Sequence, residues 1–83
     1  MREEITALLR SEVSRMIELP EESIDDAARL DELGMDSLQA LQLLVLLERT
    51  YNLQIGEQEL QHFTSIGAMT DLVVSYLTVT KAG

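Results

Sequence analysis

The sequence predicts an all-α fold: a small four-helix bundle of three longer helices and one short helix, with a long loop between the first two. Apolar residues recur at the spacing of one helix face in three stretches, and only one proline occurs in 83 residues. With 46% hydrophobic residues, the chain can bury one small core. We therefore expect a single domain over residues 1–83.

The first expected helix occupies the N-terminal stretch and ends near Leu19. Glu3 and Glu4 lie in its first turn and Arg15 near its last turn, each with the charge that the helix dipole favours. Pro20 ends the helix because proline lacks the N–H and disfavours helix in the residue before it. The apolar residues that share one side of a 3.6-residue period are Ile5, Leu8, Leu9, Val13, Met16 and Ile17.

A connection with little regular structure is expected from residue 20 to residue 34, with a brief turn at residues 26–30. A loop of this length inside a compact domain usually carries function or spans the bundle. Ile24, Leu30 and Leu33 are isolated apolar residues in this stretch, and we expect them to hold the loop against the core.

The second expected helix runs from residue 37 to about residue 51. Asp36 is a good N-cap, and the side chain of Gln39 can reach back to its N–H, so the two form a capping box. Asn52 is expected as a left-handed C-cap. Because the five consecutive residues 43–47 are all apolar, we expect this helix to be the central one, surrounded by the others.

The last third of the chain predicts a short helix and a long one. Leu53 and Ile55 are expected to turn inward around an exposed Gln54, before a short helical turn at residues 57–61. Apolar residues expected to anchor the two helices in the core are Leu60, Phe63, Ile66, Met69, Leu72, Val73, Tyr76 and Leu77.

The ends of the last helix are also predicted. Thr64 or Ser65 is expected to be its N-cap. Residues 81–83 are expected to form a frayed tail.

The charge of the chain excludes several kinds of partner. The formal net charge is −9, and nucleic acid is an improbable partner because phosphate binding needs clusters of Lys and Arg. Anionic membrane surfaces are disfavoured for the same reason. Eight acidic residues lie between Glu18 and Asp36, with Arg29 the only base in that stretch and hence the expected counter-charge. This stretch either keeps a loop solvated or steers a partner with a basic face.

Composition also limits the chemistry and the location that we expect. Cysteine is absent, so the chain has neither a disulfide nor a thiolate ligand or nucleophile. The acidic residues do not match a calcium loop, and we expect no metal site. His62 is the single histidine and has no partner arrangement that predicts catalysis. No targeting sequence or long apolar run appears, so we expect a cytoplasmic protein. We also expect the protein to be a monomer.

Ser37 is the one residue at which the sequence predicts chemistry. From the residues alone, Asp-Ser at a helix start usually indicates capping. The stretch Asp31-Glu-Leu-Gly-Met-Asp-Ser-Leu, however, resembles the D/E-x-L-G-x-D-S-L signature of acyl carrier proteins, whose serine bears 4′-phosphopantetheine. The resemblance extends over residues 5–77.

The resemblance implies a prosthetic group on Ser37. A phosphopantetheinyl transferase would move 4′-phosphopantetheine from coenzyme A to the serine hydroxyl, with magnesium held mainly by the transferase. Gly34, Asp36 and Leu38 belong to the same motif: Gly34 allows a tight turn, and Asp36 helps to hold the metal or to orient the transferase. The chain itself would not be an enzyme, but would carry acyl or aminoacyl thioesters between enzymes.

Partner recognition is implied at Met35, Gln39, Gln42 and Glu48. Carriers of fatty acid synthesis usually have acids where this chain has Gln39 and Gln42, and Arg49 adds a positive charge. We therefore expect a carrier of secondary metabolite, polyketide or amino acid type, rather than one of housekeeping fatty acid synthesis.

Expected partners are the transferase, a loading ligase or acyltransferase for acyl or aminoacyl groups, and a downstream synthase or transferase. The chain is expected to be free-standing, although an excised domain would look similar. The alternative function is a non-catalytic helical adaptor that binds a partner through the helix at residues 37–51.

Overall fold

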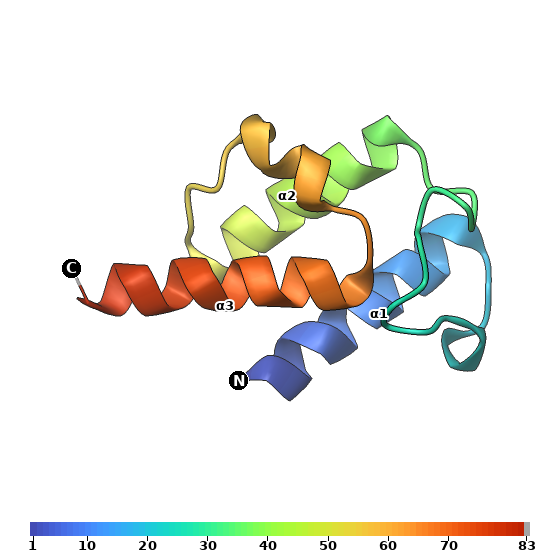
Figure 1. The fold of residues 1–83 in the computed structure, drawn as a ribbon, viewed down its shortest axis with the longest axis horizontal. Helices are drawn as coiled ribbons and strands as arrows, with labels where there is room; N and C mark the ends of the chain where they lie inside the picture. Colours follow the sequence, from blue (N-terminus) through green and yellow to red (C-terminus); the bar gives the residue numbers. More distant parts are fainter. Residues whose placement is uncertain (83) are drawn as a thin grey trace.

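The computed structural model has three long α-helices and two short 3₁₀ helices (Figure 1), which confirms the predicted all-α fold. It describes the backbone of residues 1–82 and the side chains of residues 1–78. The elements are α1 (Arg2–Ile17), η1 (Glu21–Ser23), α2 (Ser37–Tyr51), η2 (Glu57–His62) and α3 (Ile66–Ala82). The predicted bounds of α2 are confirmed. η1 was not predicted, and the short third helix is a 3₁₀ helix that extends to His62.

The core lies where the three long helices meet. In Figure 1, α3 crosses in front of α1, and α2 lies above α3. The buried side chains are Ile5, Leu9, Val13, Ile24, Leu30, Met35, Leu43, Leu44, Leu47, Leu53, Ile55, Phe63, Ile66, Met69 and Val73. Thr70 is the one buried polar residue among those described; its Oγ1 lies 3.0 Å from that of Thr6, so each hydroxyl has a partner at the α1–α3 contact.

The long loop is fixed to the beginning of α3. The N–H of Leu30 donates to the carbonyl of Thr64 at 2.9 Å, and the N–H of Gly67 donates to the carbonyl of Asp26, also at 2.9 Å. Ile24 and Leu30 are buried as predicted, whereas Leu33 is half-buried. These contacts join the segment before α2 to a helix far along the chain, which sets the position of the α2 N-terminus.

The charges of the loop are compensated more fully than the sequence predicts. Arg29 pairs with Asp31 at 2.9 Å, and Arg10 reaches across from α1 to form an ion pair with Asp26. The prediction that Arg29 is the only counter-charge for the loop is therefore wrong, because it considered only neighbours in the sequence.

The predicted helix ends are confirmed at several positions. Asn52 has φ 55° and ends α2 in the left-handed conformation. Ser65, rather than Thr64, caps α3, because its Oγ accepts the N–H of Ala68 at 3.1 Å. The predicted frayed tail is wrong for residues 81 and 82, which continue α3, and Gly83 lies outside the described residues.

The expectation that α2 is surrounded by other helices is wrong. Leu43, Leu44 and Leu47 are buried, but Val45 is 41% exposed and Leu38 is 63% exposed. With α3 packed chiefly on α1, one face of α2 remains open to solvent. The apolar run of residues 43–47 therefore contributes both to the core and to an exposed face of α2.

Candidate functional site around Ser37

Ser37 is the first residue of α2 and its side chain is exposed. The carbonyl of Asp36 already accepts the N–H of Ala40 at 3.0 Å, and the N–H of Gln39 is bonded to the Asp36 side chain. The N–H groups of Ser37 and Leu38 have no acceptor within the described part of the chain. The serine hydroxyl thus lies beside two free donors at the positive end of a helix.

A capping box holds the serine in place, as predicted. Asp36 Oδ1 accepts the N–H of Gln39 at 2.8 Å, and Gln39 Oε1 accepts the N–H of Asp36 at 3.1 Å. The amide of Gln39 also donates to the carbonyl of Met16 at 3.0 Å, which fastens the α2 N-terminus to the end of α1. Hydrogen bonds therefore fix the start of α2 both to the residue before Ser37 and to the end of α1.

Gly34 makes the turn into this site. Its φ is +105°, a conformation that side chains rarely adopt, while a Cβ at this position would meet nothing within 4 Å. Glycine is therefore required for the backbone conformation and not for space. The backbone N–H of Met35 donates to the carbonyl of Leu30 at 3.0 Å, which closes the turn directly before the Asp-Ser pair.

A small hollow of about 150 Å³ adjoins the serine. Part of its lining is apolar, because the buried side chains of Leu30, Met35 and Phe63 border it. The residues around it are Leu30, Asp31, Met35, Asp36, Ser37, Ala40, Leu60 and Phe63. A group attached to Ser37 would leave a charged rim and lie next to apolar surface.

Comparison with known proteins assigns the chain to a family. Residues 7–73 match the family described as phosphopantetheine attachment site. The chain belongs to this family. It is 36% identical, over 74 residues, to polyketide-8 synthase acyl carrier protein 2 of Streptomyces avermitilis, covering 88% of this chain and 85% of that protein.

A second relative is a much longer protein. The chain is 31% identical over 80 residues to the non-reducing polyketide synthase pkbA of Emericella nidulans, covering 96% of this chain but 3% of that synthase. The chain is thus homologous both to a small carrier and to a short part of a large synthase.

Family membership establishes the general role. The chain is an acyl carrier domain whose prosthetic group is 4′-phosphopantetheine. When attached, this group supplies a flexible arm with a thiol that holds an acyl group as a thioester. The family also implies a phosphopantetheinyl transferase and synthase enzymes as partners.

The start of α2 in this carrier suits a phosphate. The free N–H groups of Ser37 and Leu38 and the helix dipole favour a negative charge at the serine oxygen. Asp36 is exposed beside it, so its carboxylate and a phosphate would together offer the oxygen ligands that magnesium prefers. Within the described residues, no three side chains of His, Asp or Glu gather into a metal site.

The structure places the four predicted recognition residues in different surroundings. Gln42 is exposed on α2, as a contact residue must be, whereas Met35 is 8% exposed and belongs to the core. Gln39 is engaged by the capping box and Met16. Glu48 is also engaged, because its Oε2 accepts the N–H groups of Ile55 at 2.8 Å and Gly56 at 3.0 Å. In this conformation only Gln42 is fully available to a partner.

Among the residues whose side chains the structure describes, Leu38 is the most exposed large apolar one, and it follows the serine directly. The prediction placed it in the attachment motif. Its exposure shows that it is also available as an apolar contact at the mouth of the site. Exposure of this kind was not deducible from the sequence, because Leu38 belongs to the same apolar run as the buried residues of α2.

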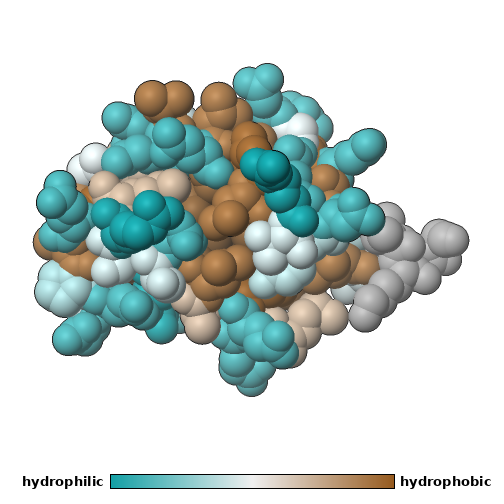
Figure 2. All heavy atoms as spheres, turned by 180° about the vertical axis from the view of Figure 1, so that it is seen from behind, coloured by the Kyte–Doolittle hydropathy of each residue, from teal (hydrophilic) through white to brown (hydrophobic). Residues whose placement is uncertain are grey.

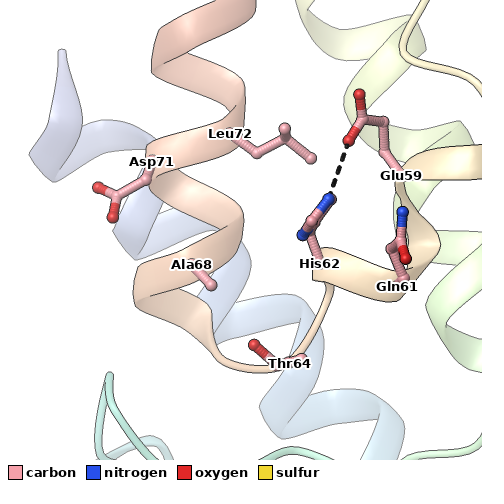
Figure 3. A pocket seen from close by; sticks show the side chains of 7 residues that line it. All are labelled: Glu59, Gln61, His62, Thr64, Ala68, Asp71 and Leu72. Carbon is pink, nitrogen blue, oxygen red and sulfur yellow. Dashed lines mark ion pairs between the residues drawn. The ribbon is translucent and has the colours of Figure 1, made fainter.

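A second hollow lies between η2 and α3, away from Ser37, and measures about 450 Å³. His62 points toward Glu59 across it, with Nε2 and Oε1 3.7 Å apart, while Asp71 points away (Figure 3). The phenol of Tyr76 donates to Glu59 Oε2 at 2.6 Å, and this bond raises the pKa of Tyr76 above its ordinary value. The cluster ties η2 to α3.

None of the helices in the described part of the chain combines the length and apolar character needed to cross a membrane.

Proposed function

We propose that Ser37 is the attachment site of 4′-phosphopantetheine and that the whole chain is one carrier domain. The position of the hydroxyl carries this proposal: it is exposed, it begins α2, and two free N–H groups lie beside it. Asp36 and Gly34 support the site, the first by capping α2 and the second by allowing the turn. Leu38 provides an apolar contact at its mouth.

The transferase moves phosphopantetheine from coenzyme A to Ser37. The Ser37 oxygen forms a bond to the phosphorus adjacent to the pantetheine unit of coenzyme A. The bond from that phosphorus to the bridging oxygen of the pyrophosphate breaks, and adenosine 3′,5′-bisphosphate leaves. The serine proton passes to a base of the transferase, because Asp36 is engaged in capping and the described residues near Ser37 include no histidine. Magnesium on the transferase neutralises the charge that develops on the phosphate oxygens.

We further propose that the cargo is an intermediate of polyketide synthesis. Two relatives support this: one is named as an acyl carrier protein of a polyketide synthase and the other as a polyketide synthase. The exposed face of α2 also lacks acids at Gln42 and Arg49, which disfavours the strongly basic docking surfaces expected of fatty acid synthesis enzymes. The loading enzyme would be an acyltransferase or ligase, and the next enzyme a synthase.

The test is the intact mass after incubation with coenzyme A, magnesium and a broad-specificity phosphopantetheinyl transferase. Wild-type protein is expected to gain one phosphopantetheine, and Ser37→Ala none. Ser23→Ala is the matched control, since Ser23 is an exposed serine in η1, and it is expected to gain one group. Modification of Ser37→Ala, or none of the wild type, would refute the assignment; the latter result would favour the adaptor function instead.

A further inference from the structure

A groove between α1 and α2 lies on the face opposite α3. Figure 2 shows this side of the molecule, where a continuous hydrophobic area crosses the middle and hydrophilic side chains border it. The groove measures about 290 Å³, and Met16, Val45 and Leu46 supply its apolar side chains. Val45 is 41% exposed, so this area is open to solvent and not a flaw in core packing.

The rim of the groove carries one unpaired positive charge in an acidic protein. Arg15 and Arg49 both line it, although the net charge of the chain is −9. Arg15 is paired with Glu12, which lies on the same rim. Arg49 is exposed and has no acidic partner within 4.0 Å among the described residues.

Arg49 differs in this respect from every other arginine of the chain. Arg2 is paired with Asp71, Arg10 with Asp26, Arg15 with Glu12 and Arg29 with Asp31. An acidic protein has carboxylates near most of its surface, so an exposed arginine without one marks the place where a carboxylate from outside would be complementary.

We propose that this groove docks an amphipathic helix of a partner synthase enzyme, with an apolar side chain against Val45 and a carboxylate on Arg49. The inference rests on the proposed carrier function and specifies the partner's chemistry. Docking a helix in a groove through spaced apolar anchors is an established mode of recognition. A second copy of the chain fits less well, because each copy has a net charge of −9 and two copies repel each other.

The distance along α2 suits this arrangement. Arg49 lies 12 residues after Ser37 in the same helix, which at 1.5 Å per residue separates the two by about 18 Å. Gln42, the groove residue on α2 nearest to Ser37, follows it by only five residues, about 8 Å. A partner helix seated toward Val45 and Arg49 would therefore leave the serine uncovered, so the arm could enter an active site while the groove holds the enzyme.

The test uses two synthetic helical peptides with the same apolar residues, one with glutamates and one with lysines on the polar face. Each is titrated into ¹⁵N-labelled full-length protein. We expect the acidic peptide to shift the amide resonances of Met16, Val45 and Leu46, and the basic peptide to leave them unchanged. Arg49→Gln should weaken binding of the acidic peptide by about twofold to fivefold, the effect of losing one exposed ion pair. Arg49→Glu should reverse the preference.

Arg29→Gln is the matched control, because it removes the same charge from an exposed arginine in the loop, and it is expected to change the affinity less than twofold. Equal binding of both peptides, no binding at the groove, or shifts that grow with protein concentration alone would overturn the proposal; the last result would indicate a second copy as the occupant. Ser37→Ala should bind the acidic peptide like the wild type. Failure of docking and failure of phosphopantetheine attachment are therefore distinguishable.

Discussion

Glu48 offers the sharpest test of how the segment after α2 is held. One of its carboxylate oxygens accepts two backbone N–H groups, from Ile55 and Gly56, at 2.8 and 3.0 Å. Ile55 is 1% exposed, so its N–H has no ready replacement when the carboxylate is removed. A hydrogen bond to a charged group contributes about 1.5–3 kcal/mol. Because Gly56 is half-buried, water can replace the acceptor of its N–H but not that of Ile55, and we expect Glu48→Ala to cost about 2 kcal/mol.

For a domain of this size, that loss lowers the melting temperature by about 8–16 °C. Thermal unfolding followed by circular dichroism measures it, with Glu57→Ala as control: Glu57 is exposed and forms no side-chain hydrogen bond or ion pair within the described residues. The melting temperature of Glu48→Gln should lie between those of Glu48→Ala and Glu57→Ala, because the amide oxygen of glutamine can still accept a hydrogen bond. If Glu48→Ala melts within about 2 °C of Glu57→Ala, the carboxylate does not hold this segment, and our reading of the contact is wrong.

Three further outcomes are expected. Asp36→Ala should lose about 1 kcal/mol of stability because the α2 N-cap is removed, whereas Ser37→Ala should unfold like the wild type in urea; equal losses would contradict the capping box. Spectrophotometric titration of the tyrosines should give midpoints above the ordinary pKa of 10.0, because the bond to Glu59 raises the pKa of Tyr76 and burial raises that of Tyr51. The stability that Tyr76 contributes is therefore present below pH 10 and lost as the pH rises through its folded pKa, and Tyr76→Phe should abolish that loss. The melting temperature should rise with added salt, which screens the acidic loop. Arg29→Gln should lower stability and steepen this dependence at neutral pH. The hydrogen bond from Arg29 lowers the pKa of Asp31, so the stability that this pair contributes is lost as the pH falls through that lowered pKa. If Arg29→Gln leaves the salt dependence unchanged, Arg10 alone balances the charge of the loop.

The sequence was sufficient to predict the elements that depend on local chemistry. Asp36, Gln39 and Asn52 mark the ends of α2 through capping, which involves residues within one turn of each other, and the structure confirms all three. The apolar spacing likewise predicted which side of α1 is buried. Ser37 was predicted from an eight-residue motif together with its place at a helix start, so this prediction did not require the fold to be known.

Contacts between distant residues could not be predicted in this way. The carboxylate of Glu48 could not be distinguished from a solvated acid, because its two donors lie seven and eight residues later. The ion pair between Arg10 and Asp26 depends on how the loop returns to α1. The burial of an apolar run also cannot be predicted from the sequence alone. Residues 43–47 are all apolar and fit a helix surrounded by others, yet Val45 faces solvent because α3 packs chiefly on α1.

The most direct test of the central claim is to locate the modified residue by peptide mapping after transferase treatment. Cleavage after Arg29 and Arg49 releases residues 30–49, a peptide in which Ser37 is the only hydroxyl-bearing residue. We predict that this peptide alone carries one phosphopantetheine, and that fragmentation places the group on Ser37. A group on any other peptide, or an unmodified residue 30–49 peptide from protein that has gained mass, would contradict the account.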